Sequence, residues 1–257
     1  MLRKLGFVVA VGLLALIVFV SVYPAAAGER GKGSDRVLSK ITFIHFRKAP
    51  GKPADKPGGK PGGKPGGKKE EEGYYTYLSK GAKWKTTEPF LLNPDCADRT
   101  ASKQLVIGAV QDAMMEWEGY GGEDIFGAIQ TDTSVSYNNG DYRGYNTISF
   151  GDYGDPNVIG VASVWGYFGG PPSGREIIEA HIQLNDPPFE WGDADVESLL
   201  MDVQNIVTHE LGHAAGMGDV YQPEAGEETM YGYSTEGETK KRDLYKGDVT
   251  GITKLYK

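Results

Sequence analysis

The stretch from Lys48 to Gly73 restricts where this chain can fold. It reads KAPGKPADKPGGKPGGKPGGKKEEEG, with Pro-Gly-Gly-Lys three times in succession between Pro57 and Lys68. A segment with so few apolar side chains cannot bury enough surface to offset the entropy lost on folding, so residues 48–73 are predicted to be a disordered linker. The main folded unit is therefore expected in residues 74–257, a length that suits one domain.

The first 27 residues are predicted to be an export signal. A basic pair at residues 3–4 precedes an apolar run over residues 5–20, and the small residues Ala25 and Ala27 form a cleavage site. An uncleaved membrane anchor is the alternative, because a run of this length could nearly span a bilayer. Both interpretations predict a protein outside the cytoplasm, either secreted into the extracellular space or anchored at the cell surface.

Residues 28–47 lie between the predicted signal and the linker. They end in an apolar segment that reads as a short strand, with Ile41, Phe43 and His45 on one face. Such a segment is not expected to stay free in water, so residues 28–47 are predicted to be either a short pro-segment or a strand that docks on the domain. No separate role is assigned to His45.

The charge of the chain divides at the end of the linker. Residues 28–73 carry 12 Lys+Arg against 6 Asp+Glu, and residues 74–257 carry 13 against 29, a net charge of −16. The acidic domain argues against nucleic acid as a partner, and the opposite charges favour docking of residues 28–47. The acidity is also compatible with bound calcium, although a solvated acidic surface is the commoner cause. We expect a monomer.

Hydrophobic periodicity predicts two long helices among several strands. The first helix lies in residues 101–120, and the second is predicted to start at Asp195, its N-cap, and to run through Val207. Strands are predicted within residues 83–94, 134–137, 146–153, 158–168 and 176–185. This pattern indicates an α+β fold, and Cys96, as the only cysteine, excludes an intramolecular disulfide.

The second helix continues into THELGHAAGMGD, residues 208–219. His209 and His213 are four residues apart on a helix, so both imidazoles can reach one ion, while Glu210 points a step around and can hold a water. A catalytic zinc has three protein ligands and one open position. No histidine follows His213, so the third ligand must be a carboxylate or must come from upstream; Gly216 can end the helix and turn the chain back.

This motif resembles that of the metzincin metalloproteases, His-Glu-x-x-His-x-x-Gly-x-x-His or Asp. The resemblance implies that His209, His213 and Asp219 bind catalytic zinc and that Glu210 is the general base. Met230 stands where metzincins have their Met-turn. Residues 248–256 resemble the closing helix of the matrixin branch, and residues 179–186 resemble the matrixin strand that borders the substrate cleft.

The resemblance implies an α+β, metzincin-like catalytic domain over residues 74–257, with a twisted mixed sheet, two long helices and a C-terminal helix. It implies a zinc endopeptidase in which a zinc-activated water, deprotonated by Glu210, attacks the peptide bond. Protein or peptide substrates would lie antiparallel to residues 181–185, and the membrane would be a partner only if the signal is uncleaved. Many matrixins hold a second zinc on several upstream histidines, but only His181 lies in that region, so a second zinc is not expected. His181 is interpreted as a surface-strand histidine.

A non-enzymatic cell-surface or adhesion module, with a structural or degenerate zinc site, is the competing interpretation. A structural zinc site is closed by four protein ligands. The motif offers three, which favours an enzyme.

Overall fold

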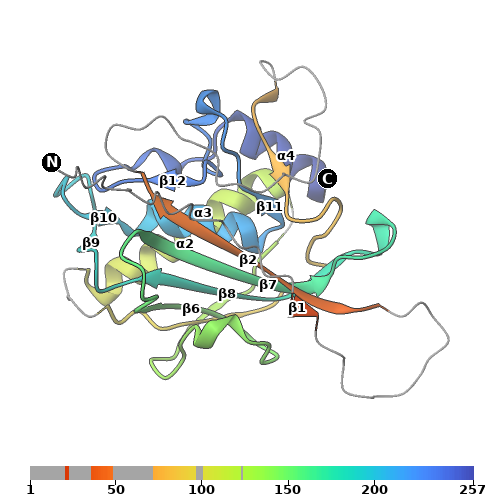
Figure 1. Cartoon of the computed structure of the whole chain (residues 1–257), viewed down its shortest axis with the longest axis horizontal. Coiled ribbons are helices and arrows are strands. Elements are labelled where there is room, and N and C mark those ends of the chain that lie inside the picture. Colours follow the sequence, from red (N-terminus) through yellow and green to blue (C-terminus); the bar gives the residue numbers. More distant parts are fainter. Residues whose placement is uncertain (1–20, 23–35, 49–71, 97–100, 123) are drawn as a thin grey trace, which may run out of the picture.

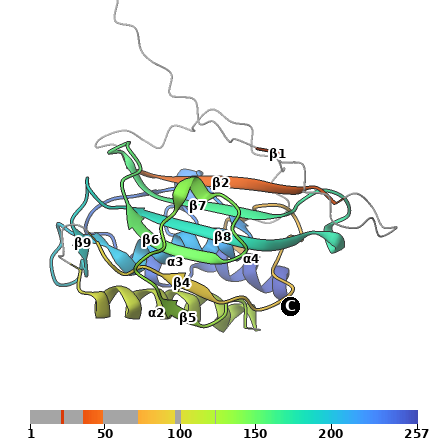
Figure 2. The ribbon, with the colours of Figure 1, turned by 90° about the horizontal axis from the view of Figure 1, so that it is seen from below.

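The computed structural model describes residues 21–22, 36–48, 72–96, 101–122 and 124–257. The predicted signal and linker therefore lie almost entirely outside the described residues. Figure 1 shows the chain as a curved sheet with helices behind it, and Figure 2, turned by 90°, shows these helices on one side of the sheet. This arrangement confirms the predicted α+β fold with a mixed sheet and three helices.

The large sheet contains both parallel and antiparallel pairs. Its strand order is β1-β2-β7-β8-β6-β4-β5, and β12 also pairs with β2. β2 with β7 and β7 with β8 are antiparallel, whereas β8 with β6, β6 with β4 and β4 with β5 are parallel. The strands span Ser21–Val22 (β1), Leu38–Arg47 (β2), Phe90–Leu92 (β4), Ile129–Thr131 (β5), Asn146–Gly151 (β6), Val158–Tyr167 (β7), Glu176–Asn185 (β8) and Tyr233–Ser234 (β12).

Short elements link the sheet to the helices. Two small two-stranded sheets are formed by Thr76–Tyr77 (β3) with Met217–Gly218 (β11), and by Trp191–Gly192 (β9) with Met201–Asp202 (β10). Single 3-10 turns occupy Asn138–Gly140 (η1), Pro172–Gly174 (η2), Pro223–Ala225 (η3) and Lys240–Arg242 (η4). The predicted strand at residues 134–137 is not formed, and the edge strand β5 lies a few residues earlier.

Helix α2 (Lys103–Gly121) forms as its sequence predicts. The Ser102 side chain accepts a hydrogen bond from the Leu105 N–H at the first turn, and Gly122, at φ +77°, ends the helix. The apolar residues at helical spacing are all buried: Val106, Val110, Ala113, Met114 and Trp117. This buried face packs against helix α3.

Helix α3 (Val203–Ala214) starts later than the sequence indicates. Its N-cap is Asp202, whose carboxylate accepts the Asn205 N–H, and not Asp195. Val196 and Leu199, which were expected on its buried face, are 83% and 73% exposed. The chain from Asp195 instead forms turns that lead into the β9–β10 pair, and this tertiary pairing overrides the local helical pattern.

Residues before the predicted linker add an edge to the large sheet. β2 pairs with β7 from Leu38 opposite Tyr167 to Phe46 opposite Val158. Figure 1 shows β2, in orange, lying along β7 at the edge of the sheet that is nearest to β12. The last helix, α4 (Lys246–Tyr256), follows η4 and packs on α2. Among the described residues, no helix combines the length and apolar character that a membrane crossing requires.

Candidate metal centre

Helix α3 brings the two motif histidines together, and the turn after it adds Asp219. The His209 and His213 rings stand at 89° with their centroids 4.9 Å apart. Gly216 follows the helix at φ +104°, and a Cβ there would lie 2.6 Å from the Ala82 carbonyl oxygen, so this turn requires glycine. Asp219 Oδ1 then lies 3.2 Å from His209 Nε2 and 3.4 Å from His213 Nε2.

Hydrogen bonds on the far side of each ring orient the two imidazoles. His209 Nδ1 donates to the Thr229 carbonyl at 2.7 Å, and His213 Nδ1 donates to the Met217 carbonyl at 3.1 Å. Each ring therefore presents an Nε2 lone pair towards Asp219. Backbone acceptors of this kind are the usual support of metal-binding histidines.

The three donor atoms fit a zinc ion. His209 Nε2, His213 Nε2 and Asp219 Oδ1 are buried and make no hydrogen bond. Bond lengths of about 2.0–2.1 Å to a tetrahedral zinc place neighbouring ligand atoms about 3.3 Å apart, which matches the two separations. Two imidazole nitrogens and a carboxylate oxygen are also ligands that zinc prefers.

The environment keeps His209 and Asp219 in the protonation states that metal binding needs. Burial lowers the pKa of His209 to about 4, so its imidazole is neutral. Burial raises the pKa of Asp219, but the neighbouring His213 and His209 rings lower it by more, so the pKa stays below its ordinary value. The Tyr221 hydroxyl donates to Asp219 Oδ2 at 2.9 Å, which leaves Oδ1 for the ion.

Glu210 is a buried carboxylate beside this centre. Both of its oxygens are buried without a hydrogen bond. It lies against β7, where a Cβ on Gly160 would stand only 2.6 Å from Glu210 Oε1. Burial, and then the charge of Asp219, raise its pKa well above the ordinary value. A carboxylate with a raised pKa is suited to accept and return a proton near neutral pH.

Met230 lies directly beneath α3. A side chain at Gly212 would collide with the Met230 sulfur and with Trp117, so the glycine allows this close packing. Asp248, in the first turn of α4, accepts backbone N–H bonds from Met230 at 3.1 Å, Thr229 at 2.6 Å and Tyr245 at 3.1 Å. The Thr229 carbonyl in turn orients His209. Asp248 therefore fixes the loop that orients the His209 ring.

We expect Asp248→Ala to lower the free energy of unfolding by at least about 3 kcal/mol. The substitution leaves the buried N–H groups of Thr229 and Met230 and the partly buried N–H of Tyr245 without an acceptor, and each buried group costs about 1–3 kcal/mol. Urea unfolding of both proteins measures the difference. Asp243→Ala, which removes an exposed carboxylate from the same loop, is the control. A loss below about 1 kcal/mol, less than one such N–H group costs, would show that these bonds are not needed.

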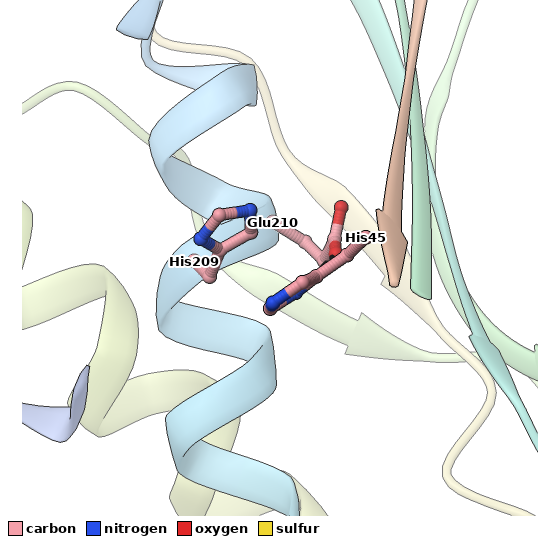
Figure 3. A group of neighbouring side chains, drawn as sticks. All are labelled: His45, His209 and Glu210. Atoms are coloured by element: carbon pink, nitrogen blue, oxygen red, sulfur yellow. Dashed lines mark ion pairs between the residues drawn. The ribbon is translucent and has the colours of Figure 1, made fainter. Parts of the chain in front are cut away.

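Two histidines have surroundings that the sequence did not predict. His181 is not a surface histidine: it is fully buried, with Nε2 2.6 Å from Glu179 Oε1 and Nδ1 2.8 Å from Thr147 Oγ1. His45, which the sequence left without a role, is buried at the centre itself. Its Nδ1 lies 3.3 Å from Glu210 Oε1, and Figure 3 shows it reaching from β2 towards His209 and Glu210 on α3.

The strand expected to bind a peptide cannot do so. Residues 181–185 belong to β8, which is bonded to β7 on one side and to β6 on the other. Its main-chain groups are therefore already used within the sheet. The expectation that a substrate lies antiparallel to this strand is wrong, because local alternation does not tell an interior strand from an edge strand.

Comparisons with known proteins found a matching family and a related protein. The model of the matrixin family matches residues 99–257 of the chain. Metalloendoproteinase 1-MMP of Arabidopsis thaliana is 34% identical over 108 residues, which cover 41% of this chain and 28% of that protein. The chain thus aligns with less than a third of that relative's length. The family match includes all four residues of the predicted site, whereas β2 lies outside it.

Proposed function

Because the chain belongs to the matrixin family, a family of zinc-dependent metalloendopeptidases, we propose that it is itself an active, exported zinc endopeptidase. His209, His213 and Asp219 would hold the zinc, and Glu210 would be the general base. The observation that carries this proposal is the convergence of three buried donor atoms without hydrogen bonds beside a buried carboxylate that also has none. Such groups are costly to bury unless an ion and a water complete them.

Zinc bound here would act as a Lewis acid and would lower the pKa of water to about 7. Glu210 lies next to the ligands without joining them, so it would orient the attacking water and take its proton. It would then deliver this proton to the nitrogen of the leaving amine as the peptide bond breaks. The proton is thus returned, and the carboxylate is ready for the next substrate.

The peptide would bind along β7. An extended substrate needs an unpaired strand edge for its main-chain hydrogen bonds. β7 uses one edge for β8; its other edge, which passes beside Glu210 at Gly160, pairs with β2 and would become available to a substrate when β2 is displaced. We therefore propose that protein or peptide substrates bind antiparallel to this outer edge of β7, with alternate side chains directed towards α3.

The competing interpretation, an adhesion module with a structural zinc, would require four protein ligands around the ion. Among the described residues, the groups that could hold one ion with both motif histidines are His209, His213 and Asp219 alone. Three ligands leave a position for water, which supports the enzyme. Export is proposed from residues 1–27 of the sequence, in keeping with the generally extracellular matrixins.

Zinc dependence can be tested directly. We expect the purified protein to bind about one zinc ion in this site, and its cleavage of unfolded casein to stop when a chelator removes the metal and to return when zinc is added. Metal content and fragment formation should be measured on the intact chain and on a form that begins at Tyr74. A protein that binds zinc but leaves casein uncut in both forms would favour the adhesion module.

A further inference from the structure

We infer that β2 inhibits the enzyme from within the same chain: residues 38–47 occupy the peptide-binding edge of β7, and His45 engages the general base Glu210. This inference rests on the proposed function, since it names the regulation of that site. It also gives a role to the apolar segment before the linker, which the family match does not cover.

β2 fills the place of an extended peptide. It runs antiparallel to β7 from Leu38 to Phe46. On its other side Phe46 and Arg47 pair with β12, in parallel, so the end of β2 is held between β7 and the segment that follows Met230. Each backbone N–H and C=O of β7 that faces β2 serves one strand at a time. A substrate can therefore bind along β7 only after β2 leaves.

Side chains of β2 cover the metal centre. Phe43 and His45 are two residues apart on the strand and so share a face. The Phe43 ring stacks on His213 at 3.9 Å with an interplanar angle of 7°, and the His45 ring lies over His209 at 3.9 Å and 30°. His45 is 1% exposed. A substrate carbonyl has no room beside these imidazoles while the two rings are in place.

The stacking also distinguishes His45 from a metal ligand. His209 and His213, which direct their Nε2 atoms to one point, stand edge to face at 89°. His45 instead lies over the His209 ring at a tilt of 30°, and its Nδ1 faces Glu210 Oε1 at 3.3 Å. It therefore covers a ligand and approaches the base.

The contact with Lys241 determines which ring nitrogen of His45 carries the proton. The Lys241 ammonium group can only donate, and it donates to the carbonyls of Tyr231 at 2.6 Å and Tyr233 at 2.8 Å. It also lies 3.7 Å from Glu238 Oε1 and 3.2 Å from His45 Nε2, and in the contact with the ammonium group the His45 nitrogen accepts. The proton of the neutral imidazole is then on Nδ1, 3.3 Å from Glu210 Oε1. His45 thus directs an N–H towards the carboxylate that would otherwise hold the attacking water (Figure 3).

Charged groups outside the centre hold β2 weakly. Arg36, just before the strand, pairs with Glu176 at 2.7 Å, and Arg47 at its end pairs with Glu236 at 2.7 Å. Both arginine side chains are more than two fifths exposed, so these pairs are screened by salt. Such contacts suit a strand that must be released as well as held.

The test separates β2 from the domain without removing either part. A recognition sequence for a site-specific protease is placed between Pro57 and Lys68 of the full chain, and the zinc-loaded protein is assayed before cutting and after cutting with dilution. Cutting ends the millimolar local concentration that a tether provides, so we expect peptide hydrolysis to rise at least about tenfold. Zinc content should stay the same, and hydrogen exchange of the β7 amides should increase.

Single substitutions in the uncut chain test the two rings. We expect His45→Ala and Phe43→Ala each to raise peptide hydrolysis and to leave zinc affinity unchanged. Ile44→Val is the matched control: Ile44 lies on the opposite face of β2 and is partly exposed, so the loss of one methyl group should leave the rate unchanged. A loss of zinc affinity in His45→Ala would make His45 a ligand and overturn its assignment to Glu210.

The measurements keep the two proposals distinct. Equal hydrolysis rates in the intact and cut proteins, with zinc bound and the β7 amides exposed by cutting, would overturn inhibition by β2. If neither form hydrolyses peptide, the proposed function fails. Hydrogen exchange then decides the inference: increased exchange in β7 after cutting supports its occupation by β2, and unchanged exchange overturns it.

Discussion

Glu210→Gln is expected to lower kcat/KM for peptide hydrolysis by about 10²- to 10⁴-fold, the usual contribution of a general base. Glutamine keeps the size of the side chain but cannot take a proton from water. Because Glu210 is proposed as the base and not as a ligand, the variant should keep its zinc. The rate should be measured on the cut and diluted protein, in which β2 no longer covers the site.

Metal analysis and a second glutamate variant complete this test. Glu224→Gln changes an exposed carboxylate on η3 and should leave both rate and zinc content unchanged. Loss of zinc from Glu210→Gln would show that Glu210 is a ligand. Full activity of a zinc-loaded Glu210→Gln protein would remove Glu210 from the mechanism.

Asp219→Ala is expected to raise the dissociation constant for zinc at least about 100-fold. Loss of a group that only supports a ligand costs about 10- to 100-fold in metal affinity, and Asp219 is proposed as a ligand itself. The alanine also leaves His209 Nε2 and His213 Nε2 without the carboxylate that now faces them. Competition with a chromophoric chelator measures the affinity, independently of catalysis.

Two further variants define what Asp219 does. Asp152→Ala removes an exposed carboxylate and should leave zinc affinity unchanged. Tyr221→Phe removes only the hydrogen bond to Asp219 Oδ2, so its effect on affinity should fall within about 10- to 100-fold. If Asp219→Ala bound zinc as tightly as the unchanged protein, the third ligand would have to be another group.

Several elements followed directly from local sequence. The helical spacing in residues 101–120 predicted α2, and its five apolar residues are buried. The strands β6, β7 and β8 were likewise predicted from alternation and from the turns between them. His209 and His213 share a helix face by their spacing alone, and Gly216 permits the turn that brings Asp219 to them. These features depend on residues that are close together in the chain, so they can be predicted from a single sequence.

Other features depend on contacts between distant segments. Asp195 and Asp202 are both acceptable N-caps, and only the β9–β10 pairing selects Asp202. The alternation in residues 176–185 predicted a strand, but its interior position in the sheet depends on β6 and β7. His181 is buried for the same reason. The alternation of side chains along a strand shows which of them share a face of the sheet. It does not show which strands pair with that strand.

The sequence by itself determined the helix of the motif, the spacing of its histidines and the turn at Gly216, and it predicts a linker at residues 48–73. Only the tertiary structure decided where residues 38–47 lie. Their alternation places Phe43 and His45 on one face, but pairing with β7 directs that face onto His213, His209 and Glu210. The physical reason is that strand pairing uses main-chain groups, which every sequence presents, so the partner of an edge strand is chosen by the whole fold.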